Sequence, residues 1–490
     1  MKKYILMVMS TVVLGFTSCS EDTLDEINKD NRHPSPDMVT AVLQLTDAVM
    51  STGFNTVSGD YAFYLGSLNE QEIGVGNNQL MKAEMRNASE LASSTTFNNT
   101  WNSTYSNLLN IQEMIRKVET EVPGNVGQFD ILGMAQVLKA LNFGVLTDLH
   151  GDIPYSEALK GQEIPQPKLD LQKDIYTGIL TTLDEAIANL DKGVALKTAS
   201  KQDILYGGDA KKWKSLAYAL KARYLLHQLA VDSSVLSKAK AAALKAVELG
   251  FDGASITEFN GVNCDNPWSA FIWSRSYTAS STTVADIMEA YGDPRLPYYK
   301  YDGRNPKAGE GNKAYAPGVL ATAQVADGSL AFPAWYDLGS QPLHLFSKAE
   351  LYFILAETQL RSSEDATAAF QTAVESSVSE IMDLFGDKTD AAAYAASLGA
   401  PTLKKLFEQK YIAQSYDEQV ETYNDLRRLK AMGENYVALK NPNNTQSGIN
   451  RYPERLPYGN SSVLGNPEIK VAYGDGTYIY TDKTWINKGK

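Results

Sequence analysis

The chain has 490 residues with 58 acidic and 45 basic side chains, which give it a formal net charge of −13. So acidic a chain is repelled by nucleic acid and by anionic lipid, which argues against both as partners. Its only cysteines are Cys19 and Cys264, so no framework of intrachain disulfides is available and the fold must be held by its core.

The N-terminus has the pattern of a targeting segment. Lys2 and Lys3 precede a short apolar run over residues 4–16, too short to span a bilayer. Small residues then stand directly before Cys19, where a lipoprotein signal peptidase would cleave and leave a diacylated cysteine. Residues 1–18 are therefore predicted to be a lipoprotein signal peptide. Phe16 departs from the usual aliphatic residue at its position, and an ordinary secretory signal is the alternative.

Residues 19–36 are polar, acidic and punctuated by proline. Such a composition cannot bury a core, so this segment is predicted to be a flexible tether between the lipid and the folded part of the chain. Acyl chains on Cys19 would hold the protein on a membrane without any spanning helix. The folded domain is predicted to comprise residues 37–490.

Apolar residues recur at helical spacing through most of the first half of the chain, and the number of predicted helices indicates an all-α fold. On one face of a helix lie Trp213, Leu216, Leu220 and Tyr224. The alanine-rich helix that follows, over 234–249, would pack against it as in tetratricopeptide-like scaffolds, although no strict repeat is visible. Further helices are predicted at about 37–50, 98–119, 129–147, 170–190, 347–361, 365–385, 402–414 and 416–431.

Two stretches interrupt this pattern, at about 251–346 and 432–490. Both are rich in Gly, Pro, Asn and Tyr, and only 281–291 looks helical within the first. Long irregular segments in a compact protein usually carry function. The stretch 251–346 is therefore expected to be a functional insertion.

Several short motifs occur in the order found in one family of bacterial surface proteins. They are Gly151-Asp-Ile-Pro-Tyr155, Lys212-Trp213, Asp293-Pro-Arg-Leu296, Glu350-Leu-Tyr-Phe-Ile-Leu-Ala-Glu357, Leu426-Arg-Arg428 and Arg451-Tyr-Pro-Glu-Arg-Leu-Pro-Tyr458. With them the chain resembles the SusD/RagB nutrient receptors, in the SusD-like branch, over essentially its whole mature length. Most of these residues are expected to shape turns or to pair arginines with carboxylates, not to touch a ligand.

The resemblance implies a tetratricopeptide-like helical scaffold with long irregular loops. It also implies a lipid-anchored protein, exposed at the surface of the outer membrane, that docks on a SusC-like TonB-dependent transporter. The ligand held between the two would be an oligosaccharide or, in some members, a peptide.

A sugar site without metal or cofactor needs flat aromatic faces and planar amide or guanidinium groups. Trp101 and Asn102 lie in an asparagine-rich segment at the start of a helix, where the family uses a tryptophan and asparagines. Packing of Trp101 into the core is the competing interpretation. A denser cluster follows in what reads as a loop without helical periodicity: Trp268, Trp273, Arg275 and Tyr277. These residues either contact ligand or pin the insertion to the scaffold.

Catalytic and metal-binding motifs are not evident. The four histidines are scattered, and the chain has no His-Glu-x-x-His helix, nucleophile elbow, Walker loop or dinucleotide fingerprint. We therefore expect a receptor that works without catalytic residues, metal or cofactor. A peptide receptor is the alternative within the family. A glycan-cleaving enzyme would need paired carboxylates beside a cleft, and a helical scaffold binding only proteins would bury the tryptophan cluster.

Overall fold

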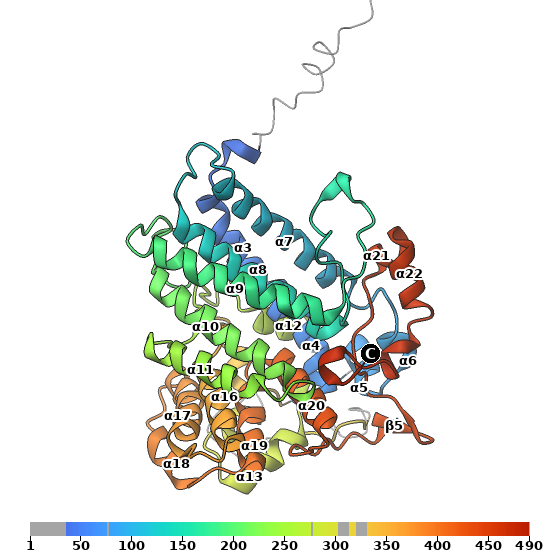
Figure 1. The fold of residues 1–490 in the computed structure, drawn as a ribbon. Coiled ribbons are helices and arrows are strands. Elements are labelled where there is room, and N and C mark those ends of the chain that lie inside the picture. Colours follow the sequence, from blue (N-terminus) through green and yellow to red (C-terminus); the bar gives the residue numbers. More distant parts are fainter. Residues whose placement is uncertain (1–35, 76–77, 276–277, 302–312, 320–330, 490) are drawn as a thin grey trace, which may run out of the picture.

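The computed structural model describes residues 36–75, 78–275, 278–301, 313–319 and 331–489, and it shows a molecule built mainly of helices (Figure 1). The predicted all-α class is confirmed, because the strands are short and form only two-stranded pairs among these residues. Cys19, the tether before Pro36 and Tyr277 lie outside the described residues.

The scaffold is a stack of helices that follow one another in the chain and pack side by side (Figure 1). Each long helix buries its apolar stripe against its neighbours, and the predicted face of Trp213, Leu216, Leu220 and Tyr224 is fully buried. The stack consists of α7 (Asn98–Glu119), α8 (Phe129–His150), α9 (Gln172–Gly193), α10 (Ala210–His227), α11 (Val235–Glu248), α16 (Lys348–Arg361), α17 (Thr367–Leu384) and α18 (Ala391–Ser397).

Helix α8 is the most deeply buried of these. It is the one helix in the described part of the chain that is apolar and long enough to cross a membrane, but 89% of that stretch is buried within the fold, as in a core helix. A small residue permits the close packing: a Cβ on Gly144 would lie 2.1 Å from the Tyr224 hydroxyl of α10. The close approach of α10 to α8 therefore requires glycine at this position.

Further helices pack on the stack and close the domain. The chain enters through η1 (Pro36–Met38), η2 (Ala41–Gln44) and α3 (Leu45–Ser51), and the rest include α4 (Gly59–Leu68), α5 (Gln79–Glu84), α6 (Ala88–Leu91), α13 (Thr282–Tyr291), α14 (Leu296–Tyr299), α19 (Leu403–Gln414), α20 (Gln419–Met432), α21 (Asn460–Gly465) and α22 (Pro467–Tyr473). Both α4 and α8 pack against α20. The first and last parts of the chain thus meet in the core.

Three antiparallel strand pairs fasten the irregular segments. β1 (Glu72–Gly74) pairs with β3 (Thr278–Ser280), and β2 (Ala254–Ile256) pairs with β4 (Leu343–Phe346). The third pair is a hairpin of β5 (Thr445–Gln446) and β6 (Ile449–Asn450). The first pair ties the insertion at 251–346 to the body through β1, and the second joins the two ends of the insertion to each other.

Two details of the predicted secondary structure are wrong. The single helix expected at 37–50 is instead two short 3₁₀ turns and α3, followed by a π-helix, η3 (Thr52–Val57). The Ala48 carbonyl, which accepts from the Thr52 backbone N–H as in a regular helix, also accepts from the Thr52 hydroxyl at 2.7 Å and from the Asn107 amide at 3.2 Å. Side chains therefore compete for helical acceptors where the α-helix gives way to the π-helix. The insertion, expected to be helical only at 281–291, also contains α12 (Pro267–Arg275) and α14.

Candidate functional site

The tryptophan-rich cluster of the insertion lies on a helix, not in a loop as predicted. Helix α12 begins at Pro267, and the side chain of Asn266 accepts a hydrogen bond from the backbone N–H of Trp268 at 2.9 Å. Asparagine before the first turn and proline at its first position are strong helix-start signals. Because α12 uses aromatic residues on more than one face, its sequence lacks the alternation of polar and apolar residues that marks most helices.

Trp268 fixes α12 to the body of the protein. Its indole is fully buried, stacked on Tyr336 with 4.6 Å between ring centroids and set edge-on to Phe63 at 4.7 Å. One turn later, Phe271 stacks on Phe63 at 4.0 Å. The ring of Trp268 is therefore closed to a ligand. It pins the insertion to the scaffold, which was the alternative to ligand contact in the prediction from sequence.

The other end of α12 faces solvent. Trp273 is 69% exposed, and Arg275 is also exposed. The buried first turn thus holds the end of the helix in place, and a large aromatic face and a guanidinium group project from it. Tyr277 follows immediately but is outside the described residues.

Beside this end of α12 is a cavity of about 560 Å³, which we call the polar hollow. It lies between α4, the region of α5 and α6, the first turn of α7, and α12. Its walls carry mostly hydroxyl, carboxyl and amide groups, and their members are Asp60, Tyr64, Gln79, Ser89, Glu90, Ser93, Thr95, Thr96, Asn99, Phe271, Ser274 and Arg275.

Some groups in the polar hollow are held in place and others remain available. The Tyr64 hydroxyl donates to Glu90 at 2.6 Å. Among the described residues, the side chains of Gln79, Asn99 and Arg275 have no hydrogen-bond or ion-pair partner. Burial raises the pKa of the Asp60 carboxyl above its usual value. The hollow thus combines fixed hydroxyl groups with free planar amide and guanidinium groups, the combination that binds the hydroxyls of a sugar.

Trp101 and Asn102 do not line the polar hollow. Trp101 is 1% exposed, and its indole N–H donates to the Ser462 hydroxyl at 3.0 Å, while Asn102 accepts a hydrogen bond from Ser461. Both line a second cavity of about 490 Å³ between α7, the segment 154–167 and α21–α22. We call it the apolar groove, because Tyr105, Leu109, Leu159, Ile469 and three prolines make up much of its wall.

The six predicted ligand residues are therefore not gathered in one place. Arg275 lines the polar hollow, and Trp273 lies on the same helix. Asn99, which is not among the predicted ligand residues, contributes an amide to the hollow from the first turn of α7. Its sequence signal was the asparagine-rich helix start that also contains Asn102, and the structure places these two amides in different cavities.

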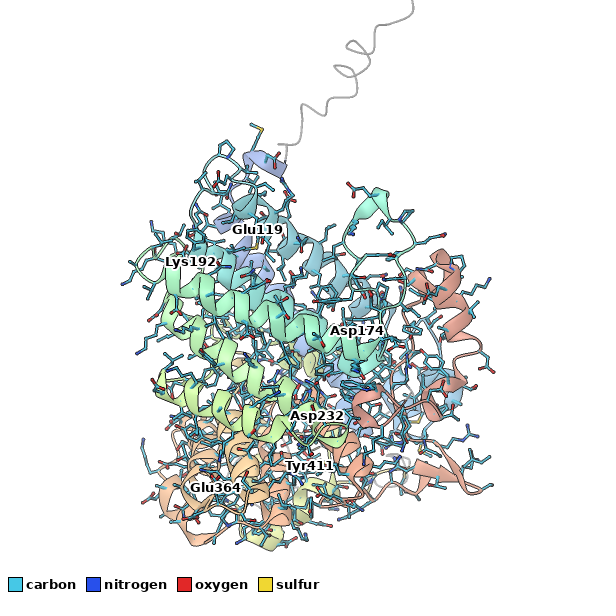
Figure 2. All side chains as sticks on the ribbon, viewed as in Figure 1. Glu119, Asp174, Lys192, Asp232, Glu364 and Tyr411 are labelled. Carbon is cyan, nitrogen blue, oxygen red and sulfur yellow. The ribbon has the colours of Figure 1, made fainter. Side chains whose placement is uncertain are left out.

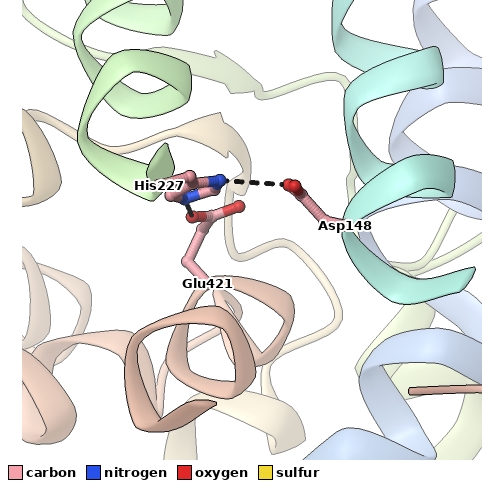
Figure 3. Close-up of side chains that lie close together, drawn as sticks. All are labelled: Asp148, His227 and Glu421. Atoms are coloured by element: carbon pink, nitrogen blue, oxygen red, sulfur yellow. Dashed lines mark hydrogen bonds and ion pairs between the residues drawn. The ribbon is translucent and has the colours of Figure 1, made fainter. Parts of the chain in front are cut away.

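Asp148, His227 and Glu421 form a second group of ionisable side chains, buried and close together (Figure 3). The Nδ1 atom of His227 lies 3.2 Å from Asp148, and the Nε2 atom lies 2.9 Å from Glu421. Burial alone lowers the pKa of His227, but the two carboxylates outweigh it and raise the pKa to about 9. With one carboxylate at each ring nitrogen, the geometry is that of a protonated imidazole joining α8, α10 and α20.

A model of the SusD-like family described as starch-binding and associating with the outer membrane matches residues 62–459. A search of curated proteins gave no match.

Solved structures also match this chain, and they belong to the same family. A SusD/RagB family protein from Bacteroides thetaiotaomicron is 32% identical, with a TM-score of 0.79 over 92% of this chain and 100% of that one. A SusD homologue from Bacteroides fragilis is 22% identical, with a TM-score of 0.72 over 92% and 100%. A chitin-binding SusD homologue from Flavobacterium johnsoniae is 21% identical, with a TM-score of 0.70 over 91% and 98%. The chain therefore belongs to the SusD-like branch of the SusD/RagB family.

Proposed function

We propose that this protein is a cell-surface lipoprotein that binds an oligosaccharide in the polar hollow and delivers it to a SusC-like TonB-dependent transporter of the outer membrane. The observation that carries the proposal is the set of unpaired planar side chains that line the hollow, Gln79, Asn99 and Arg275. The exposed indole of Trp273 lies on the same helix as Arg275. Starch binding in the family description and chitin binding by a structural relative support a glycan as the ligand.

The chemistry of the hollow suits reversible binding. A pyranose ring presents a face of C–H groups that stacks on an indole, and a rim of hydroxyls that accept from guanidinium and amide groups. Trp273 offers the first kind of contact, and Arg275 and Asn99 offer the second. The proposed ligand is bound and released without covalent change, as expected for a receptor.

Peptide binding is the second candidate, and the apolar groove favours it. Trp101 and Tyr105 meet prolines 154, 165 and 167 there, a lining better matched to apolar side chains than to sugar hydroxyls. A peptide ligand would place recognition around Asn102 instead of Asn99. The two residues are one helical turn apart on α7 and have the same side chain, so they form a matched pair for mutagenesis.

Titration calorimetry on the form lacking residues 1–19 tests the proposal. Maltooligosaccharides, chitooligosaccharides and mixed peptides serve as probes. We expect binding of an oligosaccharide that is weakened about tenfold by Arg275→Ala, Asn99→Ala or Trp273→Ala, since each removes a contact of about 1–1.5 kcal/mol.

Asn102→Ala is the control and should leave that affinity unchanged. Loss of affinity in Asn102→Ala but not in Asn99→Ala would move the site to the apolar groove. Binding of peptides and of no oligosaccharide would replace the glycan proposal by the peptide one.

A further inference from the structure

One end of the molecule exposes an unusual concentration of large apolar side chains. It is the end at which the described chain begins, beside the C-terminal ends of α7 and α9, where Figure 2 labels Glu119 and Lys192. We call it the tether-side pole. Its apolar members are Met38 (76% exposed), Val126 (61%), Leu43 (57%), Val194 (56%), Leu196 (46%) and Phe129 (36%).

Contacts between the segments show that these residues share one surface. The backbone N–H of Ala41, between Met38 and Leu43, donates to the Asn125 side chain at 2.7 Å. The segment after α9 is fixed beside Phe129 in turn, because the backbone N–H of Thr198 donates to Asp130 at 2.7 Å. The three segments that carry the apolar side chains are therefore neighbours in space.

Lysines accompany the apolar residues. Lys192 and Lys197 flank Val194 and Leu196 and are exposed, and the Lys192 ammonium lies 5.2 Å from the centre of the Phe129 ring. Apolar side chains interspersed with lysines are typical of surfaces that lie at a membrane interface, where the apolar groups enter and the ammonium groups stay at the level of the phosphates. Left in water, such a patch has no evident stabilising role.

The position at which the folded chain begins indicates that a membrane covers the tether-side pole. Pro36 belongs to this pole, and Cys19, the proposed lipidation site, precedes it by 17 positions. A segment of that length reaches at most about 60 Å when extended and about 23 Å on average as a flexible coil. A lipid on Cys19 would therefore keep the pole, more than any other face, close to the bilayer.

We propose that the tether-side pole rests on the lipid surface, with Met38, Leu43, Val126, Phe129, Val194 and Leu196 entering the boundary between head groups and acyl chains. The orientation of the receptor on the membrane rests on the proposed lipid anchor. The affinity of the pole for lipid is a property of the folded chain alone. Because the net charge of −13 opposes an anionic surface, apolar contact must drive this binding.

Sedimentation with vesicles of phosphatidylcholine tests the proposal on the form lacking residues 1–19, which has no lipid of its own. We expect it to sediment with excess vesicles. The triple variant Met38→Ser, Val126→Ser and Val194→Ser should lower the partition coefficient about tenfold or more, because it removes most of the apolar area that can enter the bilayer.

A matched triple variant controls for apolar exposure in general. Leu244→Ser, Leu464→Ser and Val471→Ser change side chains that are 47%, 74% and 83% exposed on α11, α21 and α22, and this variant should sediment like the unmodified chain. Equal loss in both variants, or no sedimentation of the unmodified chain, would overturn the proposal.

A local probe separates lipid contact from docking on a protein. With Cys264→Ser as background, an environment-sensitive dye on Val126→Cys should shift its emission to the blue when vesicles are added, and the same dye on Leu464→Cys should not. An unshifted spectrum at position 126 would exclude insertion and assign the pole to a protein partner. Glycan titration in solution is independent of both results, so failure here leaves the ligand proposal intact.

Discussion

Charged side chains in the core of this protein act as connections between helices. Arg428 of α20 forms a bidentate pair with Glu357 of α16, with distances of 2.6 and 2.8 Å, and both side chains are almost fully buried. Arg295, between α13 and α14, forms a bidentate pair with Asp293 and also donates to Ser377 of α17 and Gln409 of α19. These family-motif residues have the structural roles expected from the sequence, since a buried charge is tolerated only when it is paired.

His227 gives this buried network a dependence on pH. Its pKa in the folded protein is about 9, above the ordinary 6.5, so the folded state binds the proton more tightly than the unfolded chain does. The resulting stabilisation is complete below pH 6.5 and is lost as the pH rises through about 9. It amounts to at most about 3 kcal/mol.

Urea unfolding of the unmodified chain and of His227→Gln at several pH values tests this assignment. Other buried groups titrate in the same range, Glu350 among them with a pKa raised to about 8, mainly by burial, but they contribute to both proteins. The difference in free energy of unfolding should be large at about pH 6 and shrink toward about pH 10. A difference that does not change with pH would show that His227 is not a charged link between Asp148 and Glu421.

At the scale of elements, the two ends of α12 have different roles: the first turn packs against the protein, and the last turn is available for recognition. Trp268 in its first turn is fully buried and Trp273 is 69% exposed, although both stand in the same aromatic-rich sequence. The first anchors the helix on Tyr336 and Phe63. The second faces solvent on the same helix as Arg275, which lines the polar hollow. Substitution of Trp268 should therefore mainly lower stability, and substitution of Trp273 should mainly weaken binding.

Trp268→Ala should lower the free energy of unfolding by about 3–5 kcal/mol, because it leaves a cavity between α12 and α4. Trp273→Ala should change it by less than about 0.5 kcal/mol while weakening the oligosaccharide. Urea titration of both variants beside calorimetry gives the comparison. Equal destabilisation by the two substitutions would mean that Trp273 also packs against the protein.

The long helices could be predicted from the sequence because their apolar stripes have a clear period, and α7 spans the predicted 98–119. The aromatic cluster could not be placed in the same way. Which indole of α12 is buried depends on Tyr336, a residue 68 positions after Trp268, and no local pattern encodes that contact. Asn266 and Pro267 did carry the signal for the start of the helix. The separation of Asn99 from Asn102 likewise depends on α21, which packs against one side of α7.

At the scale of the whole molecule, the ends of the chain and the cavities have separate places. Figure 1 shows the coloured chain beginning at one end of the helical stack, with α6 and the C-terminal helices α21 and α22 on another side of the molecule. A receptor held by a lipid at its N-terminus would thus rest on the tether-side pole and keep the polar hollow, which includes Ser89 and Glu90 of α6, away from the membrane. This arrangement depends on the anchor being at Cys19.

Replacing Cys19 tests the anchor, and the other cysteine of the chain provides the control. Cys19→Ser should move the full-length protein from the detergent-rich to the aqueous phase in detergent phase separation, because the acyl chains supply about 0.8 kcal/mol for each buried methylene. Cys264→Ser, a half-buried position in the folded domain, should leave it in the detergent phase. The contribution of the tether-side pole is too small to replace acyl chains, so a Cys19→Ser protein that still enters the detergent phase would contradict lipidation at Cys19.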